Sequence, residues 1–83
     1  MSASLRRLSG EDVARILERL GFQRVSQRGS HVKLRRISAG GTKETLHIPL
    51  HSELKTGTLR AIYRQACQFV EETQLRPHFY ADA

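Results

Sequence analysis

The feature that most constrains the fold is residues 31–35, His-Val-Lys-Leu-Arg, in which polar and apolar side chains alternate. Successive side chains of a β-strand point to opposite faces, so the pattern predicts a strand with Val32 and Leu34 on one face. His31, Lys33 and Arg35 then occupy the other face. Such a strand is typical of an antiparallel sheet that is covered on one side and open to solvent on the other.

Two helices are predicted, one on each side of this strand in the sequence. The first follows Ser9, with Asp12 three residues later in a variant of the capping box. The second is capped by Thr56 or Thr58 and ends before Gln74. The apolar stripes are Val13, Ile16, Leu17 and Leu20 in the first helix, and Leu59, Ile62, Tyr63, Ala66, Phe69 and Val70 in the second.

Three strands are expected between the helices, at residues 22–27, 30–37 and 44–48. Pro49 ends the last strand because it cannot donate to the ladder. The short connections make the strands an antiparallel meander. The sequence therefore predicts an α+β fold in the order α-β-β-β-α, with a three-stranded antiparallel sheet and both helices packed on one face.

The loop at residues 38–42 sets the expected register between the second and third strands. If it closes a hairpin, the numbers of opposed residues sum to roughly 80. His47 then lies opposite Lys33, and Pro49 lies opposite His31. The open face would gather His31, Lys33, Arg35 and His47.

Length and cysteine content indicate a single small domain in a reducing compartment. The 83 residues predict one domain with its core at about residues 9–73 and a tail at 74–83 that is either docked or mobile. Cys67 is the single cysteine, which argues against a disulfide-stapled secreted fold. Without a membrane-length apolar run or a leader, the chain is expected to be soluble and cytoplasmic.

The net charge points to a polyanionic partner. Fourteen Lys and Arg residues against eight Asp and Glu residues give a net charge of +6. A surplus of this size on a small domain indicates nucleic acid first and an acidic protein second.

The histidine among cations suggests the chemistry of a metal-independent ribonuclease. RNA supplies the 2′-hydroxyl nucleophile, and cleavage needs a base, an acid and stabilisation of charge at phosphorus. His31 is the candidate general acid/base, and His47 or His51 is a candidate second proton carrier. No metal-ligand motif is present in the sequence. The candidate RNA-binding residues are Arg28, Ser30, Lys33, Arg35 and His47.

Simpler interpretations remain open on these residues alone. The same face could belong to a non-catalytic RNA-binding module, or to a basic subunit that only binds an acidic protein. Alternating cations on a strand also serve to prevent aggregation. For His51, the alternative is a hydrogen bond within the connector that follows Pro49.

The order of elements resembles the double-stranded-RNA-binding-domain topology, and four segments extend the resemblance to a family. The segments are residues 12–22, Gly29-Ser30-His31, Ile48-Pro49-Leu50-His51, and residues 54–62. In that order and spacing, over about residues 9–70, the chain is similar to the HicA family of toxins from type II HicAB toxin–antitoxin pairs.

The resemblance implies an mRNA interferase, a small endoribonuclease that cuts mRNA and arrests growth. It implies that His31, in the Gly-Ser-His motif, is catalytic, and that a HicB-type antitoxin covers the site. Lys33 and Arg35 correspond to the cations that follow the motif, and His51 matches a Pro-x-His segment with a structural role. The 38–42 loop and the tail are longer than in a minimal member.

Overall fold

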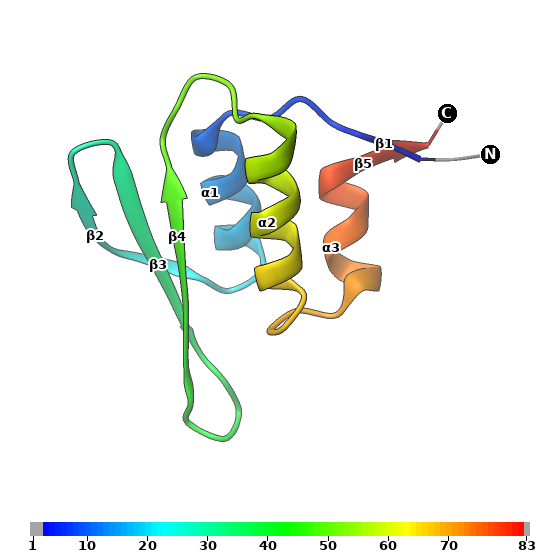
Figure 1. The fold of residues 1–83 in the computed structure, drawn as a ribbon. Coiled ribbons are helices and arrows are strands. Elements are labelled where there is room, and N and C mark those ends of the chain that lie inside the picture. Colours follow the sequence, from blue (N-terminus) through cyan, green and yellow to red (C-terminus); the bar gives the residue numbers. More distant parts are fainter. Residues whose placement is uncertain (1–2, 83) are drawn as a thin grey trace.

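The computed structural model describes residues 3–82 of the protein (Figure 1). The predicted α+β class is confirmed, because β2, β3 and β4 form one antiparallel sheet in that order. A separate two-stranded sheet pairs β1 with β5. In chain order the elements are β1 (Ala3–Leu5), α1 (Gly10–Arg19), β2 (Gln23–Arg28), β3 (His31–Ile37), β4 (Lys43–Pro49), α2 (Thr56–Ala66), α3 (Glu72–Phe79) and β5 (Tyr80–Asp82).

The N-terminus of α1 is fixed by the predicted capping box. The Asp12 N–H donates to the Ser9 hydroxyl at 3.0 Å, and the Ser9 N–H donates to the Asp12 carboxylate at 2.9 Å. The hydrogen bond from the Ser9 backbone N–H to the carboxylate lowers the pKa of Asp12, and the Ser9 side chain lowers it further. The predicted stripe of α1 faces the core, where Val13, Ile16 and Leu17 are buried.

The register of the β3–β4 hairpin is the one that the loop length predicts. Lys33 is paired with His47, and His31 with Pro49. β4 extends one residue beyond the predicted strand at each end, so that Pro49 is its last residue rather than the first residue after it. The Leu50 N–H donates to the Ser30 carbonyl, which makes His31–Pro49 a non-hydrogen-bonded pair. The missing N–H of Pro49 therefore costs the ladder nothing.

The sheet is covered on one face, as predicted. α1 and α2 lie against this face, and α3 lies beyond α2, away from the sheet (Figure 1). Among residues 3–82, no element covers the opposite face, which is called the open face below. The strand side chains of the core are Val32 and Leu34 of β3 and Leu46 and Ile48 of β4.

The C-terminal region differs from the predicted single long helix. α2 ends at Ala66, Phe69 and Val70 lie in the following turn, and a third helix begins at Glu72. The tail is docked, because Leu75 and Phe79 are fully buried and β5 pairs with β1. The helical spacing of the apolar residues continues past Ala66, so the pattern alone could not reveal the turn. The predicted Thr cap of α2 is also wrong: Lys55 is the N-cap, without a side-chain hydrogen bond.

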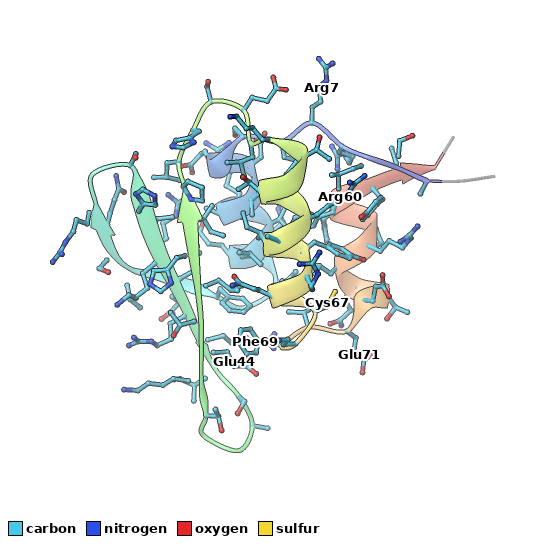
Figure 2. All side chains as sticks on the ribbon, in the orientation of Figure 1. Arg7, Glu44, Arg60, Cys67, Phe69 and Glu71 are labelled. Atoms are coloured by element: carbon cyan, nitrogen blue, oxygen red, sulfur yellow. The ribbon has the colours of Figure 1, made fainter. Side chains whose placement is uncertain are left out.

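Arg36 lies on the helix side of β3 and joins four parts of the fold. Its guanidinium donates to the Glu44 carboxylate at 2.8 Å, to the Leu20 carbonyl at 3.1 Å and to the Phe69 carbonyl at 2.5 Å. It also lies over the Phe22 ring, 5.0 Å from its centroid. Figure 2 labels two of these partners, Glu44 and Phe69, which lie near each other in the lower part of the view. One side chain thus joins β3, β4, the end of α1 and the turn after α2.

We expect Arg36→Gln to lower the free energy of unfolding by about 2–4 kcal/mol, because it leaves the Glu44 carboxylate without its partner. Glu44 is only 9% exposed. The matched control is Arg35→Gln, the same change on the open face of the same strand, with an expected effect within about 0.5 kcal/mol. Urea unfolding followed by circular dichroism measures both. Equal losses in the two variants would contradict the role assigned to Arg36.

Candidate functional site

The open face carries the polar side chains of β3 that the alternation predicts. His31, Lys33 and Arg35 occupy it, and the register places Pro49, His47 and Thr45 opposite them on β4. His31 and His47 are exposed, and Lys33 and Arg35 are half-buried. The Arg35 Nε donates to the Thr45 hydroxyl at 3.4 Å. The side chains on this face therefore come from two strands whose relative position is fixed by the ladder.

β2 adds further residues to the same face. Arg28 is paired with His31, and Ser26 is paired with Lys33. The register shifts between Arg24 and Ser26, which leaves Val25 as the extra residue of a bulge. Because of this shift, Arg24 belongs to the helix side and Arg28 to the open face.

An open hollow of about 560 Å³ lies on this face next to the β2–β3 turn. It brings together four of the predicted site residues, namely the cations Arg28 and Lys33 and the imidazoles of His31 and His47. The complete lining is Ser26, Gln27, Arg28, His31, Val32, Lys33 and His47.

Two other predicted residues lie outside the lining of the hollow. Ser30 is in the turn rather than in the strand, and its carbonyl accepts from the Leu50 N–H. Gly29 precedes it with φ +59°, the value that a two-residue hairpin turn of type II′ requires at its first position. Arg35 lies further along β3, beyond Lys33. The structure therefore groups Arg28, His31, Lys33 and His47 and places Ser30 and Arg35 on either side of them.

The cations of the open face are not neutralised within the part of the chain that the structure describes. The ion pairs of residues 3–82 are formed by Arg15, Arg24, Arg36 and Arg76. Arg24 is the contrasting case, because its hydrogen bond to Glu11, assisted by Glu18, raises its pKa. The charges of Arg28, Lys33 and Arg35 therefore remain available to a polyanion.

Sequence reasoning did not single out Arg36 and did not decide between His47 and His51. The rings of His31 and His51 lie edge to face, with centroids 6.4 Å apart and an interplanar angle of 70°. The alternation of the strand places Arg36 on the apolar face, but its partners are too distant in sequence to be predicted.

Membrane-spanning segments and metal clusters are both absent from the described residues. Within residues 3–82, every helix is too short or too polar to span a bilayer. In the same part of the chain, no group of three or more His, Cys, Asp and Glu side chains is arranged to hold a metal ion.

The fold and the open face define a small α+β domain in which a basic sheet surface carries exposed histidines. Residues 10–67, from the start of α1 to the residue after α2, match the family model described as the HicA toxin of bacterial toxin–antitoxin systems. The chain belongs to the HicA toxin family. Members of this family are known as mRNA interferases, and a toxin of this kind implies an antitoxin partner. A search of curated proteins gave no match.

β1, α3 and β5 lie outside the matched residues. All the candidate site residues, from Arg28 to His51, lie inside them. The resemblance that the motifs indicate is thereby confirmed at the level of the family.

If the open face binds a single-stranded polyanion, Lys33→Gln should reduce the slope of log affinity against log salt by about 0.7, the value for one lost phosphate contact. The matched control is Arg60→Gln, which removes one charge from the exposed surface of α2 (Figure 2) and should leave the slope unchanged. Fluorescence anisotropy with an uncleavable 2′-deoxy oligonucleotide measures both slopes. Equal changes in the two variants would show that only net charge matters.

Proposed function

We propose that this protein is an endoribonuclease toxin that cleaves mRNA in the cytoplasm, blocks translation and arrests growth. A HicB-type antitoxin restrains it. The observation that supports this most directly is the exposed imidazole of His31, which shares a hollow with the unpaired cations Arg28 and Lys33. Membership of the HicA family supplies the toxin–antitoxin context.

The proposed reaction uses the nucleophile of the substrate itself. The 2′-oxygen of the RNA attacks the adjacent phosphorus, and the bond from phosphorus to the 5′-oxygen breaks. The proton of the 2′-hydroxyl passes to a base, and a proton from an acid passes to the departing 5′-oxygen. The products are a 2′,3′-cyclic phosphate and a 5′-hydroxyl. Proton transfer and charge stabilisation suffice for this reaction, so we propose that it is independent of metal ions.

His31 is the proposed general acid/base of this reaction. Imidazole is the side chain that titrates nearest to neutral pH, which suits it to both proton transfers. Arg28 and Lys33 line the same hollow and are the proposed contacts of the reacting phosphate, where they stabilise its developing negative charge. Their positions on β2 and β3 bring positive charge to His31 from two strands.

The remaining proposed RNA contacts extend the site along the sheet. Arg35 lies beyond Lys33 on β3, where it is suited to a neighbouring phosphate of the strand. His47 lies opposite Lys33 in the hollow, and Ser30 presents a short polar side chain at the turn. Phosphate contacts of this kind position a strand without specifying its bases, so we expect weak sequence preference.

We propose that a HicB-type antitoxin binds the same surface. The open face combines unneutralised cations with exposed side chains, and an acidic protein surface laid over it would both satisfy the charges and exclude RNA. The alternative function is a non-catalytic RNA-binding module, which would bind RNA on the same face without cleaving it. A cleavage experiment distinguishes the two functions.

We expect the purified protein to cleave single-stranded RNA in EDTA and His31→Ala to reduce the rate by about 10²–10⁴-fold, the usual contribution of a general acid or base. Because His31 is exposed, its loss should leave the fold unchanged, which circular dichroism and thermal unfolding would check. Gel analysis should find 5′-hydroxyl ends on the products.

Two outcomes would count against the proposal. Binding of RNA by both proteins without any product would favour the non-catalytic module. Unfolding of the His31→Ala variant would make His31 a structural residue.

A further inference from the structure

We infer that His51 is the second catalytic group of the site, and that His31 and His51 divide the two proton transfers between them. The inference rests on the proposed ribonuclease function and adds to it a residue for which the motif alone implied a structural role. One imidazole accepts the proton of the 2′-hydroxyl, and the other, as imidazolium, donates a proton to the 5′-oxygen.

The first argument is the distance between the two rings. Their centroids are 6.4 Å apart, and both side chains are exposed. The attacking and departing oxygens of an in-line displacement lie on opposite sides of phosphorus. A base and an acid must therefore flank the phosphate, each within about 2.6–3.2 Å of its oxygen. The space between the two rings suits one phosphoryl group held in this way.

The second argument is the way in which the ladder places His51. Pairing continues beyond β4, because the Leu50 N–H donates to the Ser30 carbonyl. Extending the register by one more residue places His51 opposite Gly29, which has no side chain to fill the space. Alternate residues share a face, so His51 follows His47 and Pro49 onto the open face.

The third argument is that the backbone of His51 is held in place. Its carbonyl accepts from the Gly10 N–H at the first residue of α1, at 2.9 Å. The contact between α1 and this segment is so close that a Cβ on Gly10 would lie 2.0 Å from the Pro49 carbonyl oxygen. The backbone around His51 is therefore held by the β2–β3 turn, through Leu50, and by α1, which fixes the position from which the His51 side chain projects.

The ring of His51 has no structural task in the described part of the chain. No side-chain hydrogen bond of residues 3–82 uses it. The alternative for His51 was a hydrogen bond within the connector, but within residues 3–82 the hydrogen bond of this residue is the one that its backbone carbonyl accepts from Gly10 of α1. Both ring nitrogens are thus free to meet a substrate. His47 lines the hollow with His31 and His51 does not, but the edge-to-face orientation of the His51 ring toward His31, at 6.4 Å between centroids, favours His51 as the second proton carrier.

The test compares His31→Asn and His51→Asn in the full-length protein, with His78→Asn as the matched control. His78 is a half-buried residue of α3, away from the open face. Single-turnover cleavage of an RNA with one mapped cleavage site is measured alongside affinity for its uncleavable 2′-deoxy analogue. We expect His51→Asn to lose about 10²–10⁴-fold in rate, with affinity within about twofold and unfolding unchanged, whereas His78→Asn matches the wild type.

A second substrate separates the acid from the base. It carries sulfur in place of the 5′-oxygen at the mapped site, and the thiolate departs without a proton. The variant that lacks the acid should therefore recover most of the wild-type rate on this substrate, whereas the variant that lacks the base should not. Recovery by one of the two variants, whichever it is, supports the pair and assigns the roles.

Three results would overturn the inference. These are a wild-type rate for His51→Asn, a loss confined to affinity, and the absence of recovery in both variants on the sulfur substrate. If the wild type cleaves and only His31→Asn is impaired, the ribonuclease function stands and the role of His51 falls. Failure of the wild type to cleave any RNA would remove the proposed function itself.

Discussion

The contacts of Arg36 are the interaction on which the arrangement of the whole molecule depends. Its guanidinium satisfies a nearly buried carboxylate on β4, the Leu20 carbonyl at the end of α1 and the Phe69 carbonyl in the turn after α2. A planar group with five N–H donors can serve these acceptors together, which a lysine cannot do. Because Arg36 faces the helices, the alternation of β3 commits His31, Lys33 and Arg35 to the other face. The same strand thus carries a neutralised cation inside and unneutralised cations outside.

The parts of the fold that the sequence predicted are those governed by local rules. The capping box at Ser9 and Asp12 depends on residues three apart, and the β3–β4 register depends on one short loop. The loop length predicts the pairing of His47 with Lys33. The same register keeps the apolar residues of both strands on one face, so the two signals agree. The open face follows in turn, since one buried face leaves no freedom for a slip of one residue.

The parts that the sequence could not predict depend on residues far apart in the chain. The turn after Ala66 interrupts an unbroken apolar spacing, and it lies where the Phe69 carbonyl meets Arg36 from a distant strand. The docking of α3 depends on Leu75 and Phe79, which fill space beside α2. Whether two side chains fit such a space depends on their shapes, which the helical spacing of apolar residues does not reveal. The segment that carries His51 is joined to α1 by the Gly10 N–H, and no spacing rule links Gly10 to His51.

The candidate site and the core are opposite faces of the same strands, and this has a consequence for function. Val32 and Leu34 are buried on one side of β3, whereas His31 and Lys33 project from the other into solvent. Rigid strands can therefore hold the site in place while its side chains contribute little to stability. A site built in this way can be changed without loss of the fold, but it cannot close on itself to exclude water or RNA. If the open face is the catalytic surface that we propose, control of the enzyme requires a second molecule laid over this face, which is the role proposed for the antitoxin.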